Sequence, residues 1–561
     1  MKPLFIPSTV MLLLLVYTGR AQDVQQMARQ KAVSLHGSFD IRGISYSANG
    51  IASRRQPFSY IFSGAPTLSF YGFDIPVSFS ISEQDRSFSQ PFNQFGLSPK
   101  YKWLTLHGGY RNLSFSPYTL DGHTMLGAGL EINPGKFHFA IMYGRLNRAT
   151  TVDTTLGTLQ PFSFSRKGLA FKLGIGDERS YFNISILKAS DDSASVNNIA
   201  PITKQDVRAA ANAVASIAFR MQFFKKIFLE GDAGASLYTD DIGSQLAIST
   251  TNDWAEKIRS IMPVNGTTAF YAAYRAAFGF TGNIFSLKAE YKHIDPDFKS
   301  MGTYFFNSDI ESYTLSPSVN LAKGRFRFNG SIGSQRDNTK GQKQSTTSRA
   351  IAMANIGWDI TRKFGLDASY TNFSSNSKPT VVLVQNKYLL AQNNNSLSFT
   401  PRYVSNNERY THVVIASYNR SILTDDNTIT QTQNNITTDI LFFNYNLTLV
   451  KSGIGLTAGV NHANNSLITG NFENMGYTAG INRGWFNGKL MTALTNTYTV
   501  SKGPQGKSNI YNLMFNGNYQ AGIHHRFSLR YSLLQNSPEI ITATQLRYRE
   551  NTGEAAYTFS F

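Results

Sequence analysis

The sequence predicts an all-β fold, a transmembrane antiparallel β-barrel of about 24 strands within a range of 22 to 26. Three observations support this prediction: period-two alternation in segments as long as a tilted membrane strand, connections that are short and long in turn, and an aromatic last strand. Beyond the N-terminal leader no stretch of about 18 apolar residues occurs, so we expect no membrane-spanning helix.

The N-terminus has the three parts of a secretory signal peptide. A basic start (MK) precedes the apolar run VMLLLLVY at 10–17, and Gly19 and Ala21 are small residues near the exit. The apolar run is shorter than the roughly 20 residues that a membrane helix needs. We predict a signal peptide at 1–21, with a buried N-terminal helix as the alternative.

Strand-like alternation is clear at 285–292, where Phe, Leu, Ala and Tyr alternate with Ser, Lys and Glu. Similar patterns occur at 137–144, 325–329 and 527–533. A soluble sandwich would alternate too. The 41 Phe and 28 Tyr, many of them near predicted strand ends, favour a membrane barrel, because such barrels carry aromatic girdles at both interfaces.

Short connections such as 133–135 and 322–324 alternate with long ones such as 239–266. This asymmetry predicts short periplasmic turns and long extracellular loops. We assign the barrel to 58–561 and expect 22–57 to be an N-terminal periplasmic or inward-folded segment. Residues 34–46 also alternate, so a further strand is the alternative there.

Composition narrows the environment and the partners. The chain has 53 Lys and Arg against 35 Asp and Glu, a formal charge of +18, but the basic residues are scattered, which argues against nucleic acid. We expect membrane lipid and anionic lipopolysaccharide as the surroundings. The absence of cysteine excludes a lipoprotein anchor, disulfides and thiolate metal sites.

Two segments depart from the strand pattern. The alanine-rich segment 205–218 (QDVRAAANAVASIA) is compatible with a helix. In 254–262 (WAEKIRSIM) the apolar residues fall on one face at helical spacing, within the longest loop. We expect the latter to be an extracellular cap, with a loop folded into the lumen as the alternative.

The last strand ends on alternating aromatic residues, Tyr557, Phe559 and Phe561. This end resembles the C-terminal signature of outer-membrane barrels, and the resemblance implies recognition by the barrel assembly machinery. Leu546 and Tyr548 have the opposite parity, which predicts a bulge or a turn at 550–553.

The whole chain resembles the porin-like outer-membrane barrels of the Bacteroidota, an uncharacterised group. The resemblance rests on the segments 90–103 (QPFNQFGLSPKYKW) and 116–123 (SPYTLDGH). It implies an outer-membrane location and a barrel fold, and it carries over no functional residue.

Motifs for catalysis are weak. The histidines show no HExxH spacing, no phosphate-binding glycine loop is present, and paired acids occur only in predicted loops. His123 lies near Ser114 and Ser116, but no strained serine turn accompanies it. We predict no enzyme, no metal and no cofactor.

Parity places several cations opposite the apolar side of their strands. A charge on the lipid face costs roughly 2–4 kcal/mol at midplane, so these side chains should point into the lumen. The pore-lining candidates are Lys288, Lys292, Arg325, Arg327 and Arg530. Inward cations favour anions in a pore; alternatively they pair with acids such as Glu290 and rigidify the wall.

Two functions follow from this interpretation. The first is a channel for passive or selective diffusion of small solutes, including anionic ones. The second is a plugged structural or assembly barrel that acts through protein partners in an outer-membrane complex. The sequence does not identify the solute, the partner or the oligomeric state.

Overall fold

The computed structural model describes residues 32–70, 73–82, 94–150, 163–196, 208–247, 258–304, 307–379, 391–425, 427, 434–542 and 545–561. These residues form β-strands joined by turns and loops, with a short 3₁₀ helix, η2 (Ala322–Gly324). In this part of the chain no helix is both long and apolar enough to cross a membrane. The signal peptide predicted at 1–21 lies outside the described residues and stays a prediction.

The strands follow one another along the chain from β1 to β29. The N-terminal strands are β1 (Val33–His36), β2 (Ser38–Asn49), β3 (Phe58–Gly64), β4 (Thr67–Phe70), β5 (Phe73–Ser82), β6 (Gln94–Leu97), β7 (Lys100–Tyr101), β8 (Leu104–Asn112), β9 (Thr124–Ile132), β10 (Phe137–Asn147), β11 (Ser165–Gly176), β12 (Tyr181–Asp192), β13 (Ala211–Phe223), β14 (Ile227–Thr239) and β15 (Thr268–Thr281). The C-terminal strands are β16 (Phe285–Ile294), β17 (Ile310–Leu321), β18 (Phe326–Arg336), β19 (Ser345–Trp358), β20 (Phe364–Pro379), β21 (Ala391–Asn406), β22 (Tyr410–Asp425), β23 (Ile436–Leu449), β24 (Ile454–Leu467), β25 (Gly470–Trp485), β26 (Leu490–Gly503), β27 (Gly506–Gln520), β28 (His525–Pro538) and β29 (Tyr548–Ser560).

The strands form one closed antiparallel sheet. Each strand from β8 to β29 pairs with its neighbours in sequence, and β2 closes the circle by pairing with β29 on one side and β3 on the other. Because β1–β2, β3–β4 and β6–β7 each occupy one position in the wall, the barrel has 26 strands. Closure leaves no free sheet edge, which a membrane β-structure requires.

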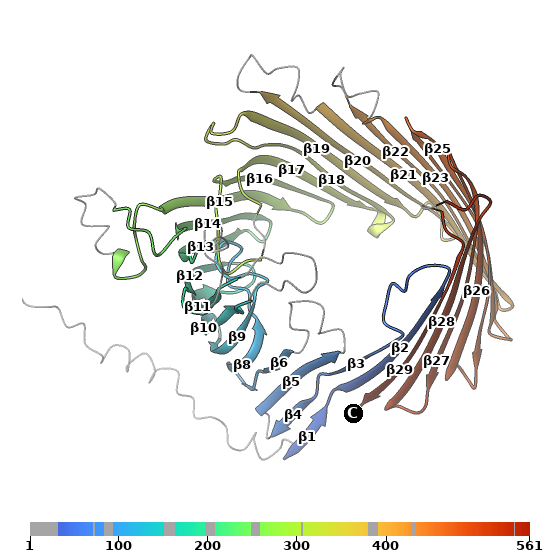
Figure 1. Ribbon diagram of the computed structural model, residues 1–561, viewed down its shortest axis with the longest axis horizontal. Coiled ribbons are helices and arrows are strands. Elements are labelled where there is room, and N and C mark those ends of the chain that lie inside the picture. The colour runs from blue at the N-terminus through green and yellow to red at the C-terminus, as the bar shows by residue number, and fades with distance from the viewer. Residues whose placement is uncertain are drawn as a thin grey trace, which may run out of the picture.

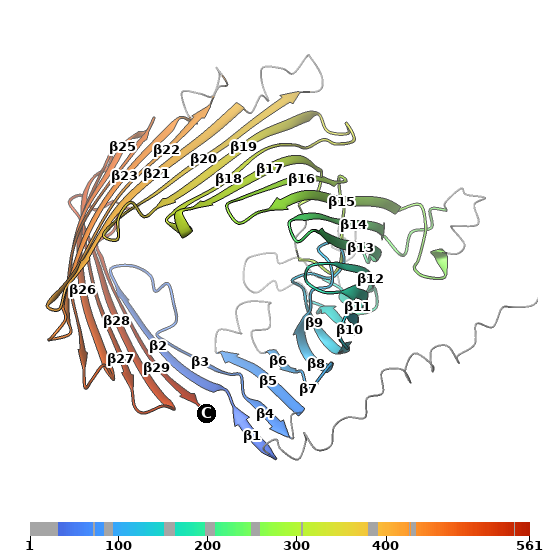
Figure 2. The same cartoon turned by 180° about the vertical axis from the view of Figure 1, so that it is seen from behind.

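The views from both sides show the closed wall (Figures 1 and 2). The long strands β19–β28 form a broad arc, and the wall curls more tightly around β9–β14. The prediction of a barrel of about 24 strands is therefore confirmed, with two more strands than the expected mean.

The break between β1 and β2 is made by Gly37. Its φ of +142° lies in the region that favours glycine, and a Cβ there would come within 2.5 Å of the Ala65 carbonyl oxygen. The facing strand breaks at the same level, between β3 and β4. The two half-strands on each side keep their antiparallel pairing across this paired kink.

The structure corrects three expectations from the sequence. The barrel wall begins before residue 58, because β1 and β2 are part of it; the alternative of a further strand at 34–46 fits. Segment 205–218 is no helix in its described part, since β13 begins at Ala211. No bulge or turn interrupts β29, which pairs without a register shift along its length. Tyr548 has the opposite parity because it lies on the opposite face of the strand from Tyr557 and Phe559. Of the predicted segment 254–262, residues 254–257 lie outside the described residues; in the described part, the N–H groups of Ile261 and Met262 donate to the Ile258 carbonyl and form a single helical turn.

The pairing registers separate an inner from an outer face, because directly paired residues share a face. The inner face contains Gly234, on which loop residues inside the barrel pack. Followed from strand to strand, this face carries Asn329, Asn355, Ser369 and Ser398. The opposite face exposes apolar side chains, including Phe278, Leu315, Phe399, Leu441, Phe443, Ile481 and Leu529. A polar interior within an apolar outer band is the architecture of an outer-membrane barrel.

Candidate functional site

One side of the barrel interior is filled by two loop segments, 115–120 between β8 and β9 and 298–301 between β16 and β17. We call them the inner plug. With side chains from strands between β9 and β16 they form a hydrophobic core, in which Leu120 and Phe298 are 0% and 1% exposed. The rings of Tyr118 and Phe298 lie 5.9 Å apart. Gly234 makes room for Tyr118, since a Cβ there would come within 2.6 Å of the tyrosine Cβ.

Buried hydrogen bonds hold the inner plug on the wall. The Asn212 amide donates to Ser236 Oγ and to the Leu237 carbonyl, both at 2.9 Å, and its Oδ1 accepts the Met301 N–H at 2.9 Å. Ser300 Oγ donates to the Thr119 carbonyl at 2.5 Å, which joins the two segments. Asn212 is fully buried, so these bonds make the plug a fixed part of the barrel.

The inner wall of β14–β16 carries a dense network of ion pairs. Arg275 lies 2.6 Å from Asp232 and 3.2 Å from both Glu230 and Glu290. Lys288 lies 3.2 Å from Glu230 and 2.8 Å from Glu290. The predicted pore cation Lys288 is thus neutralised by two carboxylates, as in the wall-rigidifying alternative.

Of the other predicted cations, Lys292 lies on the same strand as Lys288, and the others lie elsewhere in the barrel. Lys292 is on the inner face, opposite Arg275 of β15. Arg325 lies in the short turn after η2 and donates to two backbone carbonyls, of Asp359 and Ile360. Arg530 is on the inner face of β28, opposite Glu554. The predicted cations therefore do not form a ring.

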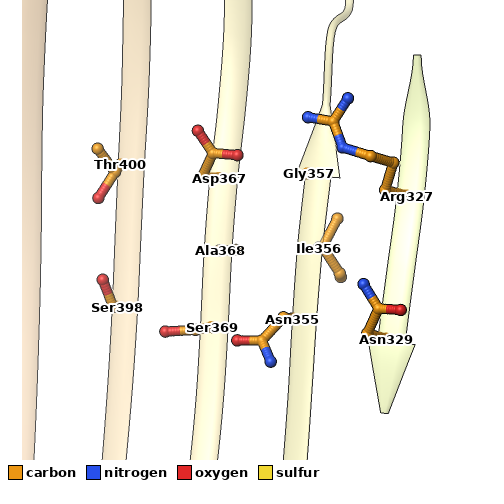
Figure 3. Close-up of a pocket in the computed structure, with 10 residues that line it drawn as sticks. All are labelled: Arg327, Asn329, Asn355, Ile356, Gly357, Asp367, Ala368, Ser369, Ser398 and Thr400. Carbon is orange, nitrogen blue, oxygen red and sulfur yellow. The ribbon is translucent and has the colours of Figure 1, made fainter. Parts of the chain in front are cut away.

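Arg327, the remaining predicted cation, borders a polar pocket on the inner wall, which we call the wall pocket. It has a volume of about 270 Å³. Its polar lining side chains are Arg327, Asn329, Asn355, Asp367, Ser369, Ser398 and Thr400. They come from four adjacent strands, β18 to β21, and project side by side from the wall (Figure 3).

The charged groups of the wall pocket form an alternating chain. Arg327 Nη1 lies 3.3 Å from Asp359 Oδ2. Arg402 then bonds both Asp359 and Asp367, so two arginines meet two aspartates. Gly357 lies between them on β19: a Cβ there would come within 3.0 Å of Arg327 Nη2 and 3.2 Å of Asp367 Oδ1. The pocket therefore has charged groups at one end and no net charge.

Beyond the wall pocket the inner face of β23–β27 is uncharged. Asp439, Glu473, Arg483, Lys502 and Lys507 all lie on the outer face of these strands. The inner positions carry mainly Asn, Thr, Ser and Gly, and no inner side chain of these strands is buried. This section of the wall is a neutral, hydrogen-bonding surface.

Asparagines on this surface face glycines of the neighbouring strand. Asn461 pairs with Gly476, where a Cβ would come within 1.9 Å of the asparagine Oδ1. Asn482 pairs with Gly455 in the same way, with a distance of 2.5 Å. The carboxamides therefore lie along the wall, over the glycines, and narrow the lumen little.

Two histidines that lie near serines lack the geometry of a hydrolase. His123 does not reach Ser114 or Ser116: its ring stacks on Tyr304 at 4.0 Å, and Ser114 donates to Asp121. Elsewhere Ser98 Oγ lies 2.8 Å from His107 Nδ1, and His107 Nε2 lies 3.3 Å from Glu131. A Ser-His-acid hydrolase has the serine on Nε2 and the acid on Nδ1, so this order is reversed. Among the described residues no three potential metal ligands form a cluster.

The predicted assembly signal lies on the outer face. Tyr557, Phe559 and Phe561 follow one side of β29, and Phe559 and Phe561 have ring centroids 5.3 Å apart. Their partner on β2, Phe39, was not predicted from the sequence, although it lies in the alternating segment 34–46. The inner plug and the wall pocket were not predicted either.

Comparisons with known proteins give only remote similarities. No family model and no curated protein matches the chain. Matching solved structures include the P pilus usher (PapC) translocation pore, at 10% identity and a TM-score of 0.38, covering 94% of this chain and 100% of that one. The FrpB iron transporter from Neisseria meningitidis matches at 10% identity and a TM-score of 0.36, covering 96% and 83%. OccAB2 from Acinetobacter baumannii matches at 12% identity and a TM-score of 0.31, covering 63% and 92%.

Proposed function

We propose that this outer-membrane barrel is a channel for the diffusion of small polar solutes. The observation that carries the proposal is the uncharged inner face of β23–β27, on which no side chain is buried. A 26-stranded barrel is wide enough for an aqueous lumen. The inner plug packs against strands between β9 and β16 on the opposite part of the wall.

Anion preference has weaker support. Lys288 and Arg327 are paired with carboxylates, and Arg530 faces Glu554. The bound carboxylates offset the attraction of Lys288 and Arg327 for an anion, whereas Glu554, opposite Arg530, forms its ion pair with Arg42. We therefore expect a channel of weak charge selectivity.

A plugged structural or assembly barrel is the second candidate. The buried inner plug favours it, since a chain segment already fills part of the interior. In this case the long extracellular loops would bind protein partners in the outer membrane. We further propose that the exported chain is inserted by the barrel assembly machinery through Tyr557, Phe559 and Phe561.

The test is single-channel recording of the refolded mature chain in a planar bilayer, with folding checked by heat-modifiable migration on a gel. We expect steady conductance and a reversal potential close to zero in a salt gradient. A folded barrel that stays silent would overturn the channel and support the second candidate. A large reversal potential of anionic sign would restore the anion-selective channel.

A further inference from the structure

We propose that the wall pocket binds a neutral polyhydroxylated solute, a saccharide of about monosaccharide size. The inference deepens the proposed channel function and rests on it for its physiological meaning. Three features of the pocket support it: its unused hydrogen-bonding groups, its compensated charges and its size.

The central side chains of the wall pocket have unused hydrogen-bonding capacity. The side chains of Asn355, Ser369 and Ser398 form no hydrogen bond with another described residue, and all three line the pocket. A carboxamide offers two donors and an acceptor, and each serine hydroxyl is both donor and acceptor. Sugar hydroxyls are also both donors and acceptors, so each side chain of the pocket can pair with a sugar hydroxyl without leaving a donor or an acceptor unsatisfied.

The spacing of these groups suits a ring with hydroxyls around its edge. Asn355, Ser369 and Ser398 are paired in register on three successive strands, β19, β20 and β21. Neighbouring strands are about 4.8 Å apart, a distance comparable with the width of a sugar ring. Hydroxyls on opposite edges of one ring can therefore reach side chains of different strands.

The charges at the end of the pocket disfavour an ionic ligand. Arg327, Arg402 and their two aspartates compensate one another. An anion would gain attraction from the arginines but lose it to the nearby carboxylates. Asp367 and Arg327 border the pocket. Although they are already paired with opposite charges, these groups can still form hydrogen bonds with neutral hydroxyls of a ligand.

The volume of the wall pocket limits the ligand to a small molecule. The volume of about 270 Å³ is slightly below the roughly 300–1,000 Å³ of typical small-molecule pockets. Beside the pocket, β22 presents Ser417 and Asn419 on the inner face, and Ile440 and Phe442 of β23 follow. Asparagine, serine and threonine recur farther along the wall, on β24–β27. A neutral solute leaving the pocket thus meets further hydrogen-bonding groups and no charge.

Binding is tested without using transport as the readout. Saturation-transfer NMR on the detergent-folded barrel would measure glucose binding, with gluconate as a charged probe of similar size. We expect saturable glucose signals and weaker gluconate signals. Asn355→Leu should weaken glucose binding roughly three- to tenfold, as expected for lost hydrogen bonds.

Asn482→Leu is the matched control, because Asn482 lies on the inner face of β25 outside the pocket. It should leave glucose binding unchanged. Should Asn355→Leu fail to fold, Ser398→Ala serves as the second variant. Absent glucose signals, signals equal in wild type and pocket variants, or tighter binding of gluconate would each overturn the inference. If the barrel binds glucose but shows no conductance, the saccharide site in the wall pocket stands and only the proposed channel function is overturned.

Discussion

Phe39 and Phe561 lie across the seam that closes the barrel, with ring centroids 5.3 Å apart and an interplanar angle of 37°. Their strands also exchange backbone hydrogen bonds at this end, since Gly37 and Phe561 bond each other in both directions at 2.9 and 3.0 Å. Phe39 further contacts Phe62 and Phe79. The seam between the first and last strands is therefore fastened by an aromatic cluster on the lipid face.

The first prediction is that the two seam aromatics stabilise closure jointly. Phe39→Ala should lower the free energy of unfolding in lipid vesicles by about 1–2 kcal/mol, because an aromatic contact and apolar area are lost. A double-mutant cycle with Phe561→Ala should give a coupling of about 0.5–1.5 kcal/mol. Phe137→Ala, on β10 away from the seam, should show no coupling to Phe561. Additive effects of Phe39→Ala and Phe561→Ala would contradict the prediction.

The second prediction concerns Gly64, at the end of β3. A Cβ there would come within 2.7 Å of Phe39 Cδ1 and 2.8 Å of a Phe79 ring carbon. Gly64→Ala should therefore displace the rings and cost about 1–3 kcal/mol of stability, as overpacking does.

Gly108→Ala is the control for this substitution. Gly108 is also a strand glycine, in β8, and a Cβ there would meet nothing within 4 Å. Chemical denaturation of both variants checks the pair. If Gly64→Ala is no less stable than Gly108→Ala, the rings do not need the space above the glycine.

Most of the barrel was predictable because strand formation and turn order are local properties of the sequence. Alternation and the short–long order of connections correctly placed the wall from β10 to β29. Two wall positions lie outside the expected 24. The segment of β1–β2 alternates at 34–46, but it was assigned to a periplasmic or inward-folded segment, with a strand only as the alternative. The position of β6–β7 is divided into pieces of four and two residues. Such pieces are too short to show a period of two.

The interior was less predictable because it depends on register between distant strands. Asn355 and Ser398 are 43 positions apart, and neither is distinctive by itself. The ion pair of Lys288 with Glu230 depends on the registers between three adjacent strands, β14, β15 and β16. The apolar residues Phe115, Tyr118 and Leu120 lie in the connection between β8 and β9, and the sequence does not tell whether such a connection folds inward.

The third prediction concerns the anchor of the inner plug. Asn212→Ala removes two donated bonds and leaves the Met301 N–H without its acceptor. It should destabilise the barrel by about 1–3 kcal/mol, the cost of an unsatisfied buried group. Single-channel current should also become noisier as the plug loosens. Asn482→Ala, at an exposed position of the inner face, should change neither stability nor current noise. If Asn212→Ala also leaves stability and current noise unchanged, Asn212 does not anchor the inner plug.

The fourth prediction is a loss of loop order in acid. The loop between β18 and β19 is fastened to the loop before β17: Lys343 Nζ lies 2.5 Å from Asp309, and Lys340 Nζ lies 2.9 Å from Asp295. Burial acts to raise the pKa of Asp309, but bonds from Lys343 and from the backbone of Thr339 and Asn338 outweigh it and hold this pKa below its usual value of 3.8.

Because the pKa of Asp309 is lower in the folded chain, its contribution to loop order is complete well above pH 3.8 and is lost as the pH falls through the lowered value. The chain has no cysteine, so Gln342→Cys in this loop gives one site for a fluorophore. Anisotropy should be high at pH 7 and fall with a midpoint below pH 3.8. Asp309→Asn, which cannot form the ion pair, should show low anisotropy at pH 7. A midpoint above about pH 4, or an ordered loop in Asp309→Asn, would show that other contacts hold the loop.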